Sequence, residues 1–149
     1  MNKNYDISIV ISLFNEAESL PELYQWIRKS LDGRYNYELI FVDDGSTDGS
    51  WEIIKGFPAD GPAVHGIRFR RNYGKSAALY EGFKAATGNV VVTMDADLQD
   101  SPEEIPAMYD KVVDEGWDIV SGWKQHRQDN KLTKNLPSKL YNATARKVT

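Results

Sequence analysis

The feature that most constrains the fold of this chain is a regular alternation of short apolar runs and helical stretches. Runs rich in β-branched residues cover residues 7–13, 38–42, 64–69 and 90–94, and a further strand begins at 118–120. The segments between them carry helical spacing or helix-capping signals. Parallel neighbouring strands need a crossover connection, so this order predicts an α/β fold with a largely parallel sheet and helices on both faces. The chain has 149 residues, enough for one domain with a core.

Local signals predict where the helices begin. Ser19 and Glu22 fit a capping box at the start of the first helix. Residues 51–55 predict a short helix, and residues 76–86, which are rich in alanine, predict a longer one. A further capped start is predicted at Ser101, because a serine followed by proline and two glutamates suits a helix N-terminus.

Composition excludes several classes of protein. The chain contains no cysteine, which excludes a disulfide framework, thiolate metal sites and a cysteine nucleophile. Its apolar runs are shorter than the ~20 residues of a membrane-spanning helix. The polar residues 1–6 and the strand-length run after them do not form a signal peptide. We therefore expect a cytoplasmic protein.

Charge is distributed unevenly along the chain. The formal net charge is −4, but residues 1–123 contain 11 Lys and Arg against 21 Asp and Glu. Residues 124–149 contain seven basic residues and one acidic residue. A basic tail on an acidic body suggests an anionic partner at the tail, although a solvated helix face would have the same composition.

Polar clusters follow three of the predicted strands. The first strand runs into Ser12-Leu-Phe-Asn-Glu16, the second into Asp43-Asp44-Gly-Ser, and the fourth into Asp95-Ala-Asp-Leu-Gln99. In open α/β sheets, ligands bind beyond the carboxyl ends of the strands. We therefore expect these three segments to meet along one edge of the sheet and to form the functional site.

The cluster after the fourth strand predicts a metal site. In an extended segment alternate side chains share a face, so Asp95 and Asp97 would point the same way, with Gln99 if the extension persists. Such an all-oxygen set suits Mg²⁺ or Mn²⁺ and leaves coordination positions for substrate phosphates. The metal would neutralise a diphosphate leaving group. The alternative is that one aspartate caps the next helix and the other is merely solvated.

Two other segments have a functional and a structural interpretation. Asp43 and Asp44 could accept hydrogen bonds from a nucleobase or ribose, or serve the turn that follows them. The basic residues 70–75 could bind a phosphate near a helix N-terminus, or form a solvated loop.

His65 and His126 lack metal-ligand spacing, and we expect both to be incidental. The chain has neither a P-loop nor a dinucleotide-binding glycine motif after its first strand.

Four motifs together resemble glycosyltransferase family 2. They are SLFNEAESL, FVDDGSTDGS, RNYGKSAALYEGFKAATG and VVVTMDADLQDSPEE. They occur in the expected order, and the resemblance covers almost the whole chain. The form DADLQDSPEE is similar to the polyisoprenyl-phosphate glycosyltransferases. That group includes the dolichol-phosphate mannose synthases and the bacterial undecaprenyl-phosphate glucosyl- and aminoarabinosyltransferases, and it implies a role in cell-wall or polysaccharide biosynthesis.

The resemblance implies a GT-A fold with a Rossmann-like sheet, a nucleotide-sugar donor and Mg²⁺ or Mn²⁺. By the family pattern Asp97 and Gln99 bind the metal. Asp95 is expected to contact the ribose, the metal or both. Asp95 and Asp97 are the expected catalytic residues. The residues expected at the donor are Ser12, Phe14, Glu16, Asp43, Asp44, Lys75, Asp95 and Ala96. The family often has proline at Ser12 and tyrosine at Phe14, so the choice between UDP and GDP stays open.

The resemblance also gives the basic tail a role. It divides the chain into a core at residues 1–123 and a basic amphipathic segment at 124–149, of which residues 132–148 are expected along the membrane surface. The expected ligands of the acceptor phosphate are Lys124, Arg127, Lys134 and Ser138. In the family more catalytic-domain sequence follows, often with transmembrane helices. We therefore expect a part of a longer protein, at the inner face of the cell membrane, whose activity is incomplete on its own.

The expected reaction is an inverting transfer of a sugar from a UDP- or GDP-sugar to a polyisoprenyl phosphate. One alternative is a soluble member of the family that acts on a hydroxyl acceptor, with a catalytic base beyond Thr149. Another is a phosphorylation-switched receiver domain, but there the acidic pair follows the first strand, and here a strand and a helix precede Asp43. We expect no nucleic-acid partner, and a homo-oligomer is left open.

Overall fold

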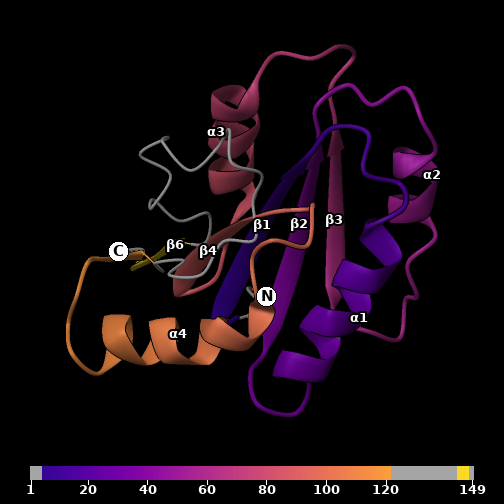
Figure 1. The fold of residues 1–149 in the computed structure, drawn as a ribbon. Coiled ribbons are helices and arrows are strands. Elements are labelled where there is room, and N and C mark those ends of the chain that lie inside the picture. The colour runs from indigo at the N-terminus through magenta and orange to yellow at the C-terminus, as the bar shows by residue number, and fades with distance from the viewer. Residues whose placement is uncertain (1–4, 122–143, 148–149) are drawn as a thin grey trace, which may run out of the picture.

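A computed structural model describes residues 5–121 and 144–147, and within them six strands form one sheet in the order β3-β2-β1-β4-β6-β5. The strands are β1 (Ile7–Leu13), β2 (Tyr37–Asp43), β3 (Ala63–Arg68), β4 (Val90–Asp95), β5 (Ile119–Ser121) and β6 (Thr144–Lys147). The helices are α1 (Leu20–Leu31), α2 (Ser50–Lys55), α3 (Lys75–Ala85) and α4 (Ile105–Val113), with a short 3₁₀ helix η1 (Pro102–Glu104) (Figure 1).

The first four strands are mutually parallel, as the sequence predicts. β1 lies between β2 and β4 and pairs with both in parallel, and β3 pairs in parallel with β2. The register places Ser12 opposite Asp95 and Leu13 opposite Asp43. The carboxyl ends of β1, β2 and β4 therefore lie at one edge of the sheet, together with the polar segments that follow them.

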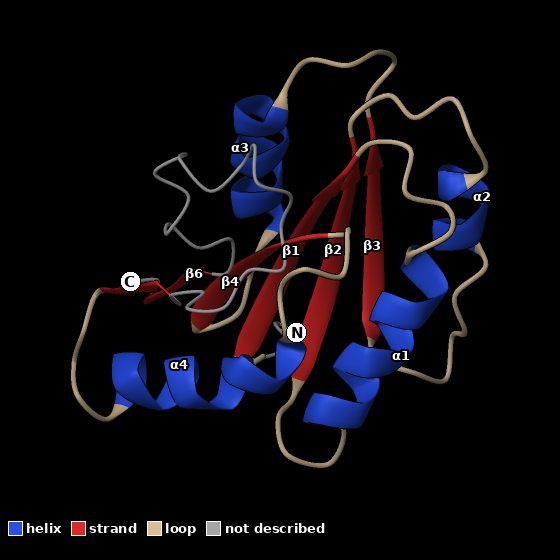
Figure 2. Cartoon of the chain, in the orientation of Figure 1, coloured by secondary structure: helices blue, strands red, loops and turns tan. Residues whose placement is uncertain are grey.

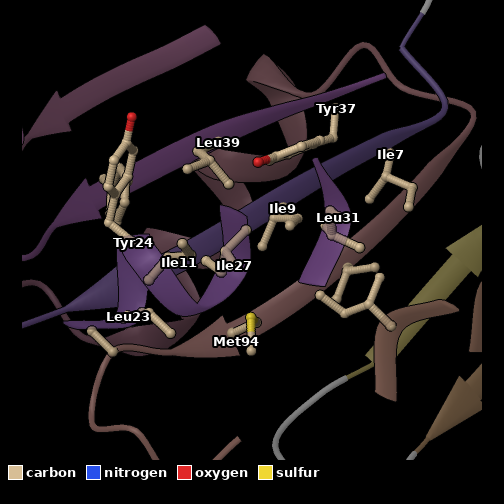
Figure 3. Close-up of a cluster of buried hydrophobic side chains, with 14 of the residues drawn as sticks. Ile7, Ile9, Ile11, Leu23, Tyr24, Ile27, Leu31, Tyr37, Leu39 and Met94 are labelled. Carbon is tan, nitrogen blue, oxygen red and sulfur yellow. The ribbon is translucent and has the colours of Figure 1, made fainter. Parts of the chain in front are cut away.

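Helices cover both faces of this sheet, because the central strands are apolar on both sides (Figure 2). Ile9 and Ile11 of β1 belong to the core cluster that includes α1 and α4, whereas Val10 belongs to a second cluster with α3. Figure 3 shows Ile9 and Ile11 beside Ile27 of α1. Each such side chain stabilises the fold by about 1.5–3 kcal/mol when it is fully buried.

Helix α3 packs very closely on β1. A Cβ atom on Gly82 would overlap the Cγ1 atom of Val10, so only glycine lets the helix backbone come this near the sheet. This contact fixes the distance of α3 from β1. It thereby places the first residue of α3, Lys75, at the edge where the predicted polar segments meet.

The predicted capping box at Ser19 is wrong. Helix α1 begins at Leu20, and the Ser19 side chain makes no capping hydrogen bond. Its Oγ lies instead 2.5 Å from the carbonyl oxygen of Ala96 and 3.0 Å from Oε2 of Glu16. The hydroxyl thus bridges the segment after β1 to the segment after β4. The predicted cap at Ser101 is present, because its Oγ accepts a hydrogen bond from the backbone amide two residues later.

One strand of the sheet, β6, is not predicted from the sequence. Thr144–Lys147 forms β6, which pairs antiparallel with both β4 and β5. The prediction that residues 132–148 lie along the membrane surface is therefore wrong for these four residues, which lie in the sheet. The strand was missed because it is short and polar, without an apolar alternation. Within the described residues, no helix has the length and apolar character needed to cross a bilayer.

Candidate active site

A cavity of about 230 Å³ opens at the carboxyl edge of the sheet. Its lining residues come from the ends of β1, β2 and β4 and from the start of α3: Ser12, Leu13, Phe14, Glu16, Asp44, Lys75, Asp95, Ala96 and Asp97. Here β1 has β2 on one side and β4 on the other, which makes this edge a topological switch point where α/β proteins bind ligands. The structure thus brings together the three segments that the sequence places at one edge.

Hydrogen bonds of Asn15 connect the loop after β1 to the loop after β2. Its Oδ1 accepts hydrogen bonds from the backbone amides of Thr47 (2.8 Å) and Asp48 (3.2 Å). Its own amide donates to Oγ of Ser46 at 2.8 Å. Asn15 has a φ of 54°, a left-handed conformation that asparagine tolerates better than most residues. Sequence reasoning missed this residue, although an asparagine at the end of a strand is a signal for such a turn.

Asp48 reinforces the same junction. Its carboxylate accepts hydrogen bonds from the amide and the hydroxyl of Ser50 (2.9 and 2.6 Å) and from the amide of Ala17 (3.2 Å). Burial alone would raise the pKa of Asp48, but these hydrogen bonds favour the carboxylate, and together they hold its pKa below the ordinary value. The ionised form of Asp48 therefore stabilises the contact between the segment after β1 and the segment after β2.

Asp43 and Asp44 both perform structural tasks. Asp43 is fully buried, and its Oδ1 accepts a hydrogen bond from the amide of Ser46 at 2.8 Å, which closes the turn after β2. Asp44 accepts hydrogen bonds from the amides of Tyr73 (2.8 Å) and Gly74 (3.1 Å), and it also lines the cavity. The structural interpretation of this pair therefore holds for both residues. Contact of either with a nucleotide stays a prediction.

Gly45 lets the loop before α3 lie against the turn after β2. It has a φ of 82°, and a Cβ atom there would come within 2.5 Å of the backbone nitrogen of Asn72. Together with the hydrogen bonds to Asp44, this close approach fixes the backbone of residues 71–74. The start of α3 is therefore positioned by the end of β2.

Lys75 is the basic residue of this loop that reaches the cavity. Its Nζ lies 2.8 Å from Oδ1 and 3.1 Å from Oδ2 of Asp95, so the ammonium contacts both carboxylate oxygens. The Lys75 side chain is half-exposed, while Asp95 is mostly covered. Another basic residue of the loop, Arg71, lies over the ring of Tyr73 at 4.9 Å instead.

The segment after β4 bends, so the extension on which the predicted alignment of Gln99 with Asp95 depends does not persist. β4 ends at Asp95, and Leu98 adopts a φ of 67°. The amide of Gln99 folds back and donates to Oδ1 of Asp97 at 3.2 Å. The alternation that would place Gln99 on the same face as Asp95 is interrupted by the left-handed Leu98. The role of Gln99 as a metal ligand stays a prediction.

The buried residue that holds this bend is Asp100. Its Oδ2 accepts a hydrogen bond from the backbone amide of Asp95 at 3.0 Å, and its side chain is fully buried. The contact closes the bend between Asp95 and Asp100 and fixes the backbone from which Asp97 projects. The sequence alone does not predict this role of Asp100, because a local turn bond of this kind leaves no periodic signal.

The donor set at the cavity fits a divalent cation. Asp95 and Asp97 both line the cavity, and Asp95 already holds one cation, the Lys75 ammonium, with its two oxygens. Within the described residues no group of three or more His, Cys, Asp or Glu side chains is placed to hold a metal ion, so the protein would supply only these two carboxylates. Mg²⁺ is commonly held by one or two carboxylates plus substrate phosphates, which is the arrangement that this pair allows.

The remaining predicted residues fall into two groups. His65 lies on β3, and its Nε2 is 3.2 Å from Oε1 of the buried Glu38, near the amino end of β2. That His65 has no part in the functional site stays a prediction. His126 lies outside the described residues, as do the four predicted acceptor-phosphate ligands: Lys124, Arg127, Lys134 and Ser138.

The fold is the GT-A fold found in glycosyltransferases of known structure. A mannosyltransferase from Pyrobaculum calidifontis, solved in complex with GDP-Man and Mn²⁺, superposes with a TM-score of 0.77 at 23% identity, over 97% of this chain and 45% of that chain. Glucosyl-3-phosphoglycerate synthase from Mycobacterium tuberculosis, solved with Mn²⁺ and UDP-Glc, gives a TM-score of 0.70 at 22% identity, over 96% of this chain and 56% of that chain. These neighbours confirm the predicted fold.

The chain belongs to glycosyltransferase family 2, because the sequence model of that family matches residues 8–148. It is 42% identical to an undecaprenyl-phosphate 4-deoxy-4-formamido-L-arabinose transferase from Aeromonas hydrophila, over 96% of this chain and 44% of the relative. A protein of the same name from Shewanella sediminis is 43% identical over 99% of this chain and 45% of its own length. The predicted resemblance to the polyisoprenyl-phosphate group is confirmed. The chain spans less than half the length of these curated relatives.

Proposed function

We propose that this chain carries the donor-binding site of an inverting glycosyltransferase that transfers a sugar from a UDP- or GDP-sugar to a polyisoprenyl phosphate. The observation that carries the proposal is the cavity at the switch point, where two aspartates and one lysine face a common space. Its chemistry suits a metal-bound diphosphate, and the relatives named for undecaprenyl phosphate point to the acceptor.

Each part of the cavity has a role in this proposal. Ser12 and Phe14 hold the base and ribose, together with Glu16 and Asp44, while the Lys75 ammonium offers charge to the diphosphate. Asp95 and Asp97 are the residues that would hold the metal. A divalent cation supplies Lewis-acid chemistry when it is bound there, because it offsets the negative charge of a leaving diphosphate.

The reaction itself is a single in-line displacement. An oxygen of the lipid phosphate forms a bond to the anomeric carbon, while the bond from that carbon to the nucleoside diphosphate breaks and its electron pair leaves with the diphosphate. The acceptor phosphate is already an anion at neutral pH, so no proton has to be removed from it. A hydroxyl acceptor would instead require a general base.

The proposal assigns two carboxylates of the cavity, Asp95 and Asp97, to the metal. A third, Asp44, accepts hydrogen bonds from the backbone amides of Tyr73 and Gly74. A phosphate acceptor arrives deprotonated, so the proposed reaction gives none of these carboxylates the role of a general base.

The acceptor side of the proposal concerns the tail. Lys124, Arg127, Lys134 and Ser138 receive the lipid phosphate, and the reaction takes place at the cytoplasmic face of the membrane. Support comes from the basic composition of residues 124–149 and from the names of the relatives. Lipid phosphates are anionic, so basic side chains and a hydroxyl are suitable ligands for them.

Calorimetry with nucleoside diphosphates tests the donor site. We expect UDP or GDP to bind more tightly with Mn²⁺ than without it, and we expect Asp97→Ala to remove this difference. Asp60→Ala, which changes an exposed aspartate by the same truncation, serves as the matched control and should keep the effect of the metal. Equal affinity with and without Mn²⁺ in the unaltered chain would contradict the proposed site.

A transfer assay with the intact protein distinguishes the acceptor. A radiolabelled sugar should pass from its nucleotide to undecaprenyl phosphate in vesicles and not to undecaprenol, the matching alcohol. Transfer to undecaprenol or to a polysaccharide hydroxyl at the same rate would instead support the alternative, a family member with a hydroxyl acceptor. A thermal-shift comparison of UDP, GDP and their sugars identifies the base.

A further inference from the structure

The Lys75 ammonium occupies the same carboxylate that the proposed function assigns to the metal. It lies 2.8 and 3.1 Å from the two oxygens of Asp95, a position in which it contacts the whole carboxylate. A divalent cation on those oxygens would lie within a few ångströms of the ammonium, and like charges at that separation repel. The ammonium and a metal ion therefore compete for Asp95.

Both ends of this contact are held by rigid elements. Lys75 is the first residue of α3, and the preceding amides of Tyr73 and Gly74 donate to Asp44 at the end of β2. Asp95 is the last residue of β4, and its amide donates to the buried Asp100. A change of partner at Asp95 therefore requires no movement of the backbone.

The lysine side chain is free to move, because its surroundings are open. More than half of the Lys75 side chain, 56%, is exposed, whereas only 25% of the Asp95 side chain is. A lysine ammonium is a point charge on a flexible four-carbon stem, so it can change partner by rotation about its side-chain bonds. It lines the same cavity as Asp97, where a diphosphate would offer it new anionic oxygens.

We propose that Lys75 is a placeholder cation: it neutralises Asp95 in the empty cavity and moves to the diphosphate when metal and nucleotide bind. This inference rests on the proposed function and adds a rule to it, namely that metal and nucleotide bind cooperatively. The metal alone has to displace the ammonium, whereas the diphosphate gives the displaced ammonium a new partner. Each ligand consequently raises the affinity of the other by the same factor.

Manganese titration of three proteins, followed by electron paramagnetic resonance, tests this rule. Lys75→Met removes the charge but keeps the length of the side chain, and Lys84→Met makes the same change on another lysine of α3. Without nucleotide, we expect Lys75→Met to bind Mn²⁺ about tenfold more tightly than the unaltered chain, because a competing charge is gone. Lys84→Met should bind Mn²⁺ with unaltered affinity.

Nucleotide binding gives the complementary result. With saturating Mn²⁺, Lys75→Met should bind the nucleoside diphosphate that calorimetry identifies, UDP or GDP, about tenfold less tightly than the unaltered chain does.

Chemical labelling of the unaltered chain gives an independent measurement. Acylation of the Lys75 amine, quantified by mass spectrometry, should increase when saturating Mn²⁺ frees the ammonium from Asp95. Addition of the nucleoside diphosphate should then reduce the labelling below the level of the ligand-free chain. Labelling that does not respond to Mn²⁺ would overturn the placeholder role.

The outcomes separate this inference from the proposed function. If Mn²⁺ tightens nucleotide binding but Lys75→Met binds Mn²⁺ no better than Lys84→Met, the placeholder role is wrong and the donor site stands. If the unaltered chain binds no nucleotide in the presence of Mn²⁺, the proposed function fails and this inference fails with it.

Discussion

The substitution Asp44→Asn tests how the cavity is assembled. Asp44 is 5% exposed and accepts hydrogen bonds from the amides of Tyr73 and Gly74 at 2.8 and 3.1 Å. A hydrogen bond to a charged group contributes about 1.5–3 kcal/mol. Asparagine retains one acceptor oxygen and turns an amide nitrogen toward the other backbone N–H, so it loses one such bond and places two donors together. We expect a loss of about 2–3 kcal/mol in the free energy of unfolding.

Thermal unfolding followed by circular dichroism measures this loss. For a chain of this size, 1 kcal/mol corresponds to roughly 2–4 °C, so Asp44→Asn should lower the Tm by about 4–12 °C. Asp60→Asn, the same change at an exposed aspartate, should lower it by less than about 2 °C. Nucleotide binding, measured well below the lower Tm, should also weaken in Asp44→Asn, because Lys75 loses its fixed position. Equal Tm values for the two variants would refute the idea that Asp44 holds the loop before α3.

Two further predictions concern stability. Gly82→Ala should lower the free energy of unfolding in urea by about 1–2 kcal/mol, because overlap with Val10 outweighs the roughly 1 kcal/mol that alanine adds to a helix. In the double variant with Val10→Ala the penalty of Gly82→Ala should become smaller; an unchanged penalty would exclude that contact as its cause. The pKa of Asp48 is lowered below its ordinary value of 3.8 in the folded chain, so its stabilisation is present above that pH and is lost as the pH falls further. Compared with the unaltered chain, Asp48→Asn should therefore have a lower free energy of unfolding near pH 7, and its stability should depend less on pH below 4. Urea midpoints of the two proteins that change in parallel across that range would contradict this role of Asp48.

The strands and their common edge could be predicted because they depend on patterns within short segments. The apolar runs at 7–13 and 90–94 coincide closely with β1 and β4, since a strand that is buried on both faces needs apolar residues throughout. The meeting of the polar segments then follows from parallel pairing alone, and the register of Ser12 with Asp95 confirms it.

The details of the site depend on contacts between distant residues, and these leave no local signal. Ser19 fits a capping box by sequence, but its hydroxyl reaches the carbonyl of Ala96, which is 77 positions away. Leu98 adopts a left-handed conformation that leucine rarely occupies, and the buried side chain of Asp100 closes the bend around it. Tertiary contacts in both cases override what the local sequence favours.

A crystal structure of the chain soaked with Mn²⁺ and the nucleotide that binds most tightly tests the central claim most directly. We expect an anomalous manganese peak between the carboxylates of Asp95 and Asp97, next to the diphosphate, with the Lys75 ammonium on the diphosphate oxygens. A structure in which the nucleotide binds elsewhere, or in which Lys75 still holds Asp95 and no manganese lies in the cavity, would contradict the account.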